Sequence, residues 1–216
     1  NLLSSALCMD KAYTHVICEN AGIPMAKYQL IASLSEINHD EIEYPCIVKP
    51  SREGSSFGVS YVKTPAELEA AIHHAFEFDD RVLIEEYING VEVGMSILDT
   101  KDGRIISEVD QVNVSGEVFD FQEKYHPHNT ETLKESTFPK DVLDEVKSKG
   151  SKVFDALYCD QFSRLDFFIT EDHKIYFNEV NTIPGFTANS RYPQMMDHVG
   201  VKYTDLIQRL VEDILC

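Results

Sequence analysis

The sequence predicts an α+β fold built from two subdomains, and three observations support this prediction. The chain has 216 residues, of which 43% are hydrophobic and 26% are charged, as in a globular protein with a buried core. Helix-like and strand-like patterns are mixed without the regular alternation of a βαβ fold. The turn signal Asn89-Gly90 separates two such mixed segments, so we expect subdomains at residues 1–90 and 91–216.

The first subdomain is expected to contain two helices and four strands. Asp10 is a suitable N-cap for a first helix that Gly22 would close, with Val16, Ile17 and Ala21 on one side. Thr64 and Glu67 form a capping box, and Pro65 suits the first position of a second helix. The buried side of that helix would carry Leu68, Ala71, Ile72, Ala75 and Phe76. Strands are expected at residues 28–32, 46–50, 59–62 and 82–88, with a polar Gly/Ser-rich loop at 51–58.

The second subdomain is expected to begin with strands 91–98 and 105–114 around the hairpin turn Asp102-Gly103. A helix over 141–157 would turn Leu143, Val146, Val153, Phe154 and Leu157 inward, and strands 162–169 and 174–178 follow. Residues 181–196 are expected to form a long loop. Thr204 would cap a last helix with Leu206, Ile207, Leu210, Val211 and Ile214 on its apolar side. Residues 115–138 are polar and, at about 24 residues, long enough to indicate a functional loop.

The charge balance limits the possible partners. With 19 Lys and Arg against 37 Asp and Glu, the net charge is −18, which disfavours binding to nucleic acid. No apolar run reaches the roughly 18 residues of a membrane span, and no signal peptide is visible. The five cysteines are scattered without a CxxC pattern, as expected for free thiols in a cytoplasmic protein. Because the chain opens without Met, we expect it to be a piece of a longer protein.

The strongest signal for a metal site lies near the end of the chain. Arg164 and Asp166 fall on one predicted strand, and Glu179 and Asn181 on the next. Because side chains alternate along a strand, each pair shares a face, and a hairpin would bring two carboxylates and an amide together. Oxygen ligands of this kind suit Mg²⁺. A solvated hairpin is the alternative, which the apolar flanking residues make less favourable.

A second signal joins Lys49, at a strand end, to the loop Gly54–Gly58. Small residues let backbone N–H groups approach an anion, and the lysine supplies charge. An ordinary flexible turn explains the loop equally well on this pattern alone. The same loop fits G-x-S-x-G, but the hydrolase motif requires a strand leading directly into the turn and a helix after it. The P-loop and dinucleotide-binding glycine motifs are both absent from the sequence.

Seven segments together resemble the D-alanine–D-alanine ligase family of the ATP-grasp superfamily. They are SALCMDK (5–11), IVKP (47–50), EGSSFGV (53–59), LIEEYI (83–88), EKY (123–125), RLD (164–166) and NEVNTIPGFT (178–187). The resemblance implies an ATP-grasp fold in which two α+β subdomains sandwich a nucleotide, with 115–138 as a lid. It also implies that this chain corresponds to the central and C-terminal domains, without the N-terminal domain.

The resemblance assigns roles to individual residues. The implied nucleotide-binding set comprises Lys11 and Lys49 at the phosphates, Glu53, Gly54, Ser55 and Ser56 in the loop above them, Glu85, Glu86, Tyr87 and Ile88 at the adenine, Glu92 at the ribose, and Phe168 and Asn178. Asp166, Glu179 and Asn181 would hold two Mg²⁺ ions, or Mn²⁺ in their place. The implied catalytic set comprises Arg164 and the Gly185 N–H at the oxyanion, Ser55, and Lys124 and Tyr125 in the lid.

The implied reaction is the joining of D-alanine to a second D-amino acid through an acyl phosphate, for peptidoglycan precursors. Ser190, Arg191 and Phe121 are assigned to the second substrate. Arg191 and the Phe-containing segment 119–125 are most similar to the D-Ala–D-Ser ligases of vancomycin resistance, so we favour D-Ser over D-Ala. Family members are commonly homodimers. Two alternatives remain: a nucleotide-binding fragment without catalysis, and an ATP-grasp ligase for another carboxylate.

Overall fold

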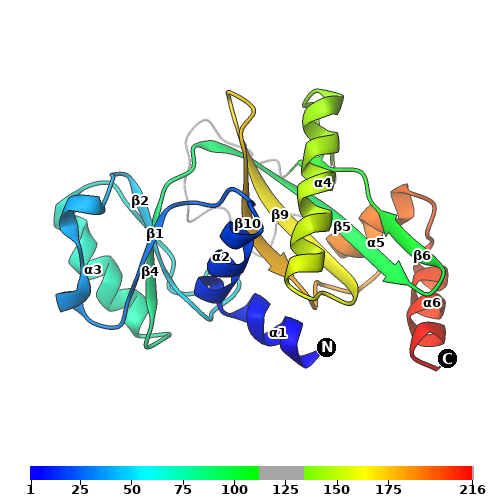
Figure 1. Ribbon diagram of the computed structural model, residues 1–216, viewed down its shortest axis with the longest axis horizontal. Coiled ribbons are helices and arrows are strands. Elements are labelled where there is room, and N and C mark those ends of the chain that lie inside the picture. The colour runs from blue at the N-terminus through cyan, green and yellow to red at the C-terminus, as the bar shows by residue number, and fades with distance from the viewer. Residues whose placement is uncertain (112–133, 216) are drawn as a thin grey trace.

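The computed structural model describes residues 1–111 and 134–215, which form two antiparallel sheets flanked by helices (Figure 1). The smaller sheet has the order β1-β4-β2-β3 and the larger one β10-β9-β5-β7-β8, with β6 paired to β5. The strands are β1 Tyr28–Ile31, β2 Cys46–Pro50, β3 Ser60–Val62, β4 Val82–Glu86, β5 Gly90–Thr100, β6 Gly103–Ile106, β7 Asp110–Gln111, β8 Lys134–Glu135, β9 Gln161–Thr170 and β10 Ile175–Asn181. The helices are α1 Leu2–Met9, α2 Lys11–Asn20, α3 Pro65–Phe76, α4 Lys140–Ala156, α5 Arg191–His198 and α6 Tyr203–Leu215, with short 3-10 turns at Leu34–Glu36 and His39–Glu41.

The smaller sheet buries one face under α3 and leaves the other for the cavity described below. Side chains alternate along β2, so Cys46 and Val48 pack with Ile72 of α3 in one apolar cluster. Ile47 and Lys49 therefore point to the opposite side of the sheet. The same alternation in β4 places Glu85 beside Ile47, its partner in the strand register. The predicted strands in this part of the chain are confirmed to within two residues at each end.

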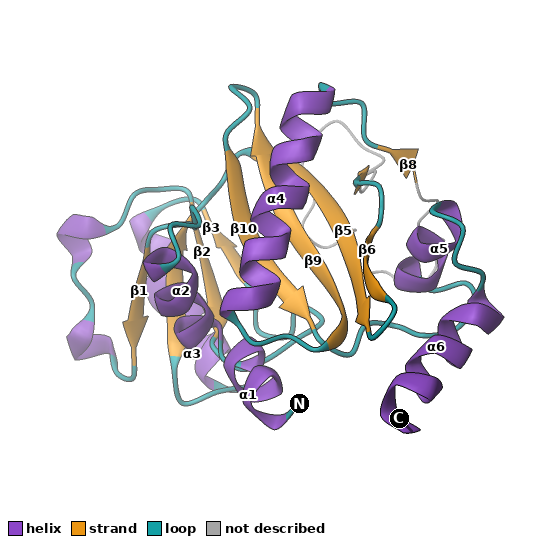
Figure 2. Ribbon diagram, turned by 45° about the vertical axis from the view of Figure 1, so that its right-hand side comes forward, coloured by secondary structure: helices purple, strands orange, loops and turns teal. Residues whose placement is uncertain are grey.

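The larger sheet is covered on both faces, and Figure 2 shows α4 lying over one of them. Val93, Met95 and Ile97 of β5 belong to the main apolar cluster together with side chains of α4. The alternate residue Leu98 belongs instead to a cluster with α5 and α6. Polar side chains at even positions of β9, including Arg164 and Asp166, share this second face because Leu165 and Phe167 face α4.

A β-bulge in β10 decides where Glu179 points. The register pairs Phe177 with Phe167 but Glu179 with Asp166, so Asn178 is an extra residue on its strand. Without the bulge, Glu179 would follow Ile175 and Phe177 into the apolar cluster under α4. With it, Glu179 lies on the same face of the sheet as Asp166, as the predicted hairpin requires.

The residues before the smaller sheet pack against the larger one. Cys18 of α2, together with Ile23 and Met25, lies in the main apolar cluster beside Phe177 of β10. Figure 1 shows α2 between the two sheets and α1 below the larger one. The division of the chain at residue 90 into two subdomains stays a prediction, and the first 26 residues link both sheets.

Several sequence-based expectations for the helices were wrong. α1 was not predicted, because Leu2 and Leu3 are exposed and give it no amphipathic pattern; Asn1 caps it by accepting a hydrogen bond from the Ser4 N–H at 2.9 Å. Asp10 does cap α2, but the buried side of α2 carries Ala12, Thr14, His15 and Cys18, whereas Val16 is exposed. In α3, the Thr64 side chain does not make the capping hydrogen bond to the backbone that a capping box requires; its hydroxyl donates to Glu67 Oε1 at 3.0 Å instead.

The C-terminal segment differs from its prediction in three ways. The expected loop 181–196 contains α5, which tolerates Pro193 because the N–H groups of a first helical turn have no partner in the helix. α6 begins at Tyr203, so Thr204 lies inside it and does not cap it. Of the predicted apolar face of α6, Leu206 and Leu210 are buried, whereas Ile207, Val211 and Ile214 are exposed. Earlier in the chain, the strand expected at residues 105–114 is divided in two, because β6 ends at Ile106 and β7 covers Asp110–Gln111.

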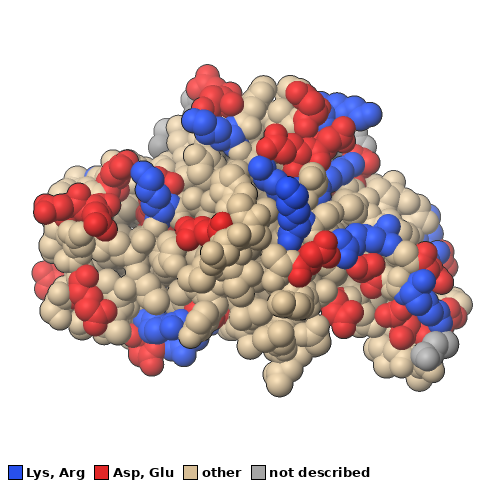
Figure 3. Space-filling view, in the orientation of Figure 1, with Lys and Arg blue, Asp and Glu red and all other residues tan. Residues whose placement is uncertain are grey.

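The surface shows the acidic balance of the sequence. On the face seen in Figure 3, Lys and Arg side chains lie among Asp and Glu side chains. Among the described residues, no helix combines the length and the apolar composition needed to cross a bilayer.

Candidate functional site

A cavity of about 490 Å³ lies between the facing sides of the two sheets. Its walls come from β2 and β4 on one side and from β5, β9 and β10 on the other. The loops after β2 and β10 and the first residues of α2 and α5 complete it. The residues predicted from the sequence that line it are Lys11, Lys49, Glu53, Gly54, Ser55, Ser56, Glu85, Glu86, Tyr87, Ile88, Glu92, Arg164, Phe168, Asn178, Glu179, Asn181, Gly185 and Arg191.

Two lysines supply positive charge to this cavity. Burial and the nearby charge of Lys49 lower the pKa of Lys11, while Glu179 and Glu85 act in the opposite direction. The Lys11 ammonium donates to the Glu53 carbonyl at the start of the glycine-rich loop. Lys49 is 8% exposed and projects from the end of β2. An anion between the two ammonium groups would reduce their mutual repulsion, so this end of the cavity suits phosphate.

Glu85 holds Lys49 in place from the neighbouring strand. Its Oε2 lies 2.6 Å from Lys49 Nζ, and its Oε1 lies 2.8 Å from His15 Nε2. Burial alone would raise the pKa of Glu85, but Lys49 and His15 outweigh it and lower the pKa to about 2. The ring of His15 packs on Tyr28, with centroids 4.2 Å apart, and its Nδ1 is buried without a hydrogen-bond partner. Glu85 therefore acts in this structure as the counter-ion of Lys49.

The glycine-rich loop closes the same end of the cavity in an uncommon backbone conformation. Ser55 and Ser56 have φ angles of 50° and 57°, in the left-handed region that non-glycine residues seldom adopt. Such residues often mark a ligand-binding site, because the surrounding structure must stabilise their conformation. Gly58 also has a positive φ of 70°, and a Cβ there would lie 2.7 Å from both Phe78 and Pro50. The loop is thus packed at its end and open to the cavity at its centre.

The beginning of the loop is fixed by two aspartates. Asp79 accepts from the Arg52 N–H at 2.8 Å and pairs with the Arg52 guanidinium. Asp10, the N-cap of α2, accepts from Ser51 Oγ at 2.8 Å and pairs with Arg81. The loop and Lys11 are therefore tied to one polar cluster, which fixes the lysine relative to the loop.

Two of the predicted metal ligands, Glu179 and Asn181, line the opposite wall, and Asp166 lies next to them without lining the cavity itself. The Asn181 amide donates to Asp166 Oδ2 and to Glu179 Oε1, at 3.2 Å in each case. Asp166 is 1% exposed and also accepts from Arg164 Nε and Nη2, at 3.1 and 2.8 Å. The strand alternation predicted for these four residues is confirmed.

The donor set fits Mg²⁺ in its chemistry. The Asn181 amide lies within hydrogen-bonding distance of both carboxylates, and hard oxygen ligands of this number leave positions for phosphate and water. Residues 1–111 and 134–215 contain no cluster of three or more His, Cys, Asp or Glu side chains that could hold a metal ion alone. For Asn181 to bind the metal ion, its amide group would have to turn so that the oxygen atom, rather than the nitrogen atom, faces the two carboxylates.

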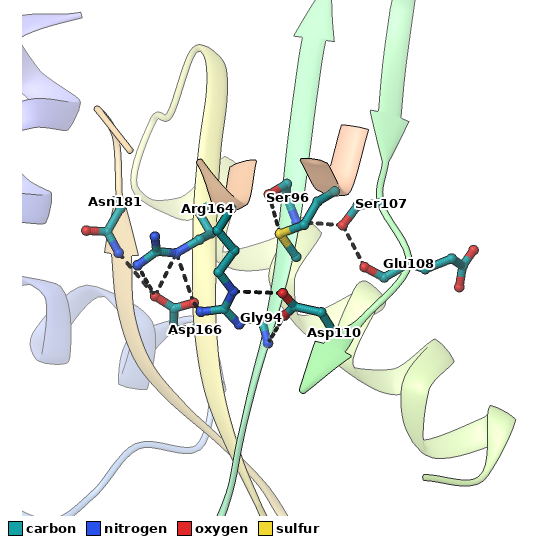
Figure 4. A network of polar contacts seen from close by, with 10 residues as sticks. Gly94, Ser96, Ser107, Glu108, Asp110, Arg164, Asp166 and Asn181 are labelled. Atoms are coloured by element: carbon teal, nitrogen blue, oxygen red, sulfur yellow. Dashed lines mark hydrogen bonds and ion pairs between the residues drawn. The ribbon is translucent and has the colours of Figure 1, made fainter. Parts of the chain in front are cut away.

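Arg191 lines the cavity and bonds both Asp110 and Asp166, two carboxylates that Figure 4 labels. Its Nε and Nη2 donate to Asp110 at 2.7 and 2.5 Å, and its Nη1 donates to Asp166 Oδ1 at 3.3 Å. Asp110 also accepts from the Gly94 N–H at 3.1 Å. A Cβ on Gly94 would overlap the Arg191 guanidinium and lie 2.9 Å from Asp110 Oδ1. Glycine is therefore the residue that leaves room for this ion pair.

Asp110 was missed by the sequence-based prediction. It falls within the expected strand 105–114 and belongs to no motif, so its place beside Arg191 follows only from the folded sheet. His15 was missed for the same reason, since it lies on a helix as a lone histidine. Ile183 and Pro184 also line the cavity, beside Gly185.

The remaining predicted residues fall in two groups. Ser190 does not line the cavity; its Oγ accepts from the Thr187 N–H at 3.0 Å and holds the turn before α5. Its hydroxyl lies 3.0 Å from where a Cβ on Gly185 would stand. Phe121, Lys124 and Tyr125, and most of the predicted lid 115–138, lie outside the described residues.

The chain is similar in sequence to a known family of proteins. Residues 17–212 match the protein family described as D-ala D-ala ligase C-terminus. The chain is 38% identical over 215 residues to the vancomycin B-type resistance protein VanB of Enterococcus faecalis, covering 98% of this chain and 63% of that protein. It is 37% identical over 221 residues to a D-alanine–D-alanine ligase of Caldicellulosiruptor bescii, covering 97% and 60%. It thus spans about three fifths of the length of these curated relatives.

Solved structures show the same fold. The VanG D-Ala:D-Ser ligase from Enterococcus faecalis aligns with a TM-score of 0.83 at 39% identity, covering 97% of this chain and 62% of that one. The D-alanine–D-alanine ligase from Bacillus anthracis complexed with ATP aligns with a TM-score of 0.81 at 28% identity, covering 100% and 67%. These alignments confirm the predicted α+β ATP-grasp fold. Since the family match also extends over most of the sequence, the chain belongs to the D-alanine–D-alanine ligase C-terminal family.

Proposed function

We propose that this chain is the ATP- and Mg²⁺-binding part of a ligase that joins D-alanine to a second D-amino acid. The observation that carries the proposal is that one cavity holds both Lys11 and Lys49 and the acidic residue Glu179. Cations for a polyphosphate and oxygen ligands for its metal ion are needed together for phosphoryl transfer. The relatives named above support this assignment.

The chain's own residues would bind and orient the nucleotide. Lys11 and Lys49 would contact phosphate oxygens, and the backbone of the glycine-rich loop would cover them. Residues 85–88 and Glu92 would line the adenosine part. Asp166, Glu179 and Asn181 would hold Mg²⁺, which would neutralise phosphate charge and orient the transferred group. Asp166 would then share its oxygens with Arg164 and Arg191.

The proposed reaction has two steps. A carboxylate oxygen of D-alanine attacks the terminal phosphorus of ATP, and the bond between that phosphorus and ADP breaks to leave an acyl phosphate. The amine of the second substrate attacks the acyl carbon, and inorganic phosphate leaves. Arg164 donates hydrogen bonds to Asp166 from Nε and Nη2. We assign the remaining nitrogen of Arg164, Nη1, together with the Gly185 N–H, to the oxyanion formed in the second step. The segment 115–138 would exclude water.

We assign the second substrate site to the end of the cavity at Arg191, with D-serine favoured over D-alanine. Asp110 and Asp166 hold the guanidinium at the cavity wall, where a side-chain hydroxyl could accept from it. The similarity to the VanG D-Ala:D-Ser ligase supports this choice. Ser190 would act by shaping the turn beside Arg191, and Phe121 stays assigned from the sequence alone.

The proposal places the product among peptidoglycan precursors and the protein in the cytoplasm, where ATP is made. It also expects a homodimer of the full-length protein, in which further residues hold the first D-alanine. This chain alone should bind nucleotide but should not make dipeptide, because effective molarity depends on holding both reactants.

A product assay on the full-length protein tests the proposal. With ATP, Mg²⁺, D-alanine and D-serine, we expect ADP, phosphate and a dipeptide in equal amounts, the dipeptide identified by mass spectrometry. Nucleotide turnover without dipeptide would contradict the assigned substrates. Absence of both turnover and nucleotide binding would contradict the assigned site.

A further inference from the structure

Two cysteines that are distant in the sequence meet away from the cavity. Cys8 lies in the last turn of α1, and Cys159 lies between α4 and β9. Their Sγ atoms are 3.9 Å apart, and both side chains are partly exposed. The buried hydroxyl of Ser4 donates to Cys159 Sγ at 3.4 Å and lies 3.7 Å from Cys8 Sγ.

The two thiols differ in acidity because they share a hydrogen bond. The side chain of Cys8, together with Ser4, lowers the pKa of Cys159 to about 6, although burial acts in the opposite direction. The same hydrogen bond and burial raise the pKa of Cys8. Cys159 is therefore the more acidic of the two thiols, and Cys8 lies in contact with it. A low-pKa, partly exposed thiolate beside a second thiol is the usual arrangement of redox-reactive cysteines.

The other described cysteines lack these properties. Cys18 and Cys46 are buried, at 0% and 1% exposure. Burial raises the pKa of Cys18 to about 12 and that of Cys46 to about 11. Neither should react with a thiol reagent in the folded protein at neutral pH, so Cys46 provides an internal reference.

We propose that Cys8 and Cys159 form a thiol modification site, which hydroperoxides oxidise to a disulfide. The Cys159 thiolate attacks one peroxide oxygen, the O–O bond breaks, and the other oxygen takes a proton and leaves as water or an alcohol. Cys159 is then a sulfenic acid. The Cys8 sulfur attacks the Cys159 sulfur, its proton goes to the leaving hydroxyl, and water is released. In total two thiols lose two electrons, and the peroxide gains them.

The bond requires only a small movement. A disulfide has an S–S distance of about 2.05 Å, so the two sulfur atoms must approach by about 2 Å. Cys8 is near the C-terminal end of an eight-residue helix, and its side chain is only partly buried. The cross-link would join the segment that leads into Lys11 to the segment that leads into Arg164. The proposal does not depend on the proposed function, since neither cysteine lines the cavity.

Peptide mapping after oxidation tests the proposal. The folded full-length protein is treated with a small excess of hydrogen peroxide, the remaining thiols are alkylated under denaturing conditions, and the non-reduced digest is analysed by mass spectrometry. We expect a linked peptide pair containing Cys8 and Cys159 that disappears after reduction, with Cys46 recovered as alkylated thiol. Recovery of Cys8 and Cys159 as unlinked thiols, to the same extent as Cys46, would overturn the proposal.

Single variants assign the two roles. In Cys8→Ser, the sulfenic acid on Cys159 lacks its partner and should be trapped by dimedone. In Cys159→Ser, Cys8 should show no dimedone adduct, and Cys46→Ser, the matched control, should keep the linked peptide. Before oxidation, Cys159 should react with iodoacetamide at pH 7 at least about tenfold faster than Cys46. Equal alkylation rates, or trapping on Cys8 rather than Cys159, would contradict the assignment.

Discussion

Arg191 donates two hydrogen bonds to Asp110, from Nε at 2.7 Å and from Nη2 at 2.5 Å, and this pair fixes the guanidinium at the cavity wall. A third bond goes from Nη1 to Asp166. An arginine has five N–H donors, so three bonds to carboxylates account for three of them and leave two for a substrate. The arginine is therefore both held by the protein and able to donate, which combines a structural role with the proposed recognition of D-serine.

The first prediction concerns Arg191→Met in the full-length protein. Activity should fall with both second substrates, because Asp110 and Asp166 lose a buried partner. The fall in kcat/KM should be about ten- to a hundredfold greater for D-serine, since a hydrogen bond from a charged donor contributes about 1.5–3 kcal/mol. The measurement is the ratio of the two dipeptides formed in competition. Arg209→Met, on α6, is the control. An unchanged ratio of the two dipeptides in Arg191→Met would contradict the recognition of D-serine and show that Arg191 has only a structural role.

Glu179→Gln should nearly abolish turnover by the full-length protein. The change keeps the shape of the side chain but removes one of the two carboxylates proposed to hold Mg²⁺. Steady-state assays should be compared with those of Glu171→Gln, in the exposed turn between β9 and β10. Activity of Glu179→Gln within about tenfold of wild type would show that this carboxylate is not a metal ligand.

Gly58→Ala should destabilise the protein, whereas Gly54→Ala in the same loop should not. At Gly58 the φ angle is 70°, and the new Cβ would lie 2.7 Å from Phe78 and Pro50. At Gly54 no atom lies within 4 Å of the position that the new methyl group would take, and φ is outside the left-handed region. We expect Gly58→Ala to lower the free energy of unfolding by about 1 kcal/mol or more and Gly54→Ala to change it by less than about 0.5 kcal/mol. Urea unfolding measures both, and equal effects would contradict the packing described for this loop.

Asp79 should make stability depend on pH in the acidic range. Burial alone would raise its pKa, but hydrogen bonds from Arg52 and from the Arg52 and Arg81 backbone lower it to about 2. The unfolded chain has the ordinary value of about 3.9, so the stabilisation is present above pH 4 and is lost as the pH falls toward 2. Asp79→Asn should lower the free energy of unfolding at pH 6 and flatten its decline below pH 4.

Urea unfolding at several pH values checks this prediction. Asp80→Asn is the matched control, because Asp80 also pairs with Arg52 but is largely exposed, and exposed pairs contribute little. If Asp79→Asn and wild type lose stability in parallel between pH 4 and 2, another carboxylate accounts for the decline.

Local sequence signals predicted most of the fold that carries the site. The alternation in Arg164–Asp166 and in Glu179–Asn181 correctly placed four polar side chains on one face. The prediction did not show that this placement needs a bulge at Asn178, because a bulge arises from pairing with a distant strand. α5 lies in the segment 181–196 that was predicted as a loop, and its Pro193 stands at position three, where a helix tolerates proline.

Long-range partners were the part that the sequence could not supply. Asp110 precedes Arg191 by 81 residues, and no pattern along the chain connects them. Likewise the Glu85 carboxylate contacts Lys49 and His15, and no pattern along the chain connects these three residues. In each case the contacts of a charged residue depend on which side chains the folded sheets bring next to it. The periodicity of the sequence does not contain that information.

Calorimetric titration of this chain with a non-hydrolysable ATP analogue and Mg²⁺ tests the central claim most directly, namely that the cavity between the sheets is a nucleotide site. We expect saturable heat, with affinity weakened about tenfold or more in Lys11→Met but not in Lys63→Met, whose lysine is exposed. Absence of heat at millimolar nucleotide, from a chain shown to be folded by circular dichroism, would contradict the claim.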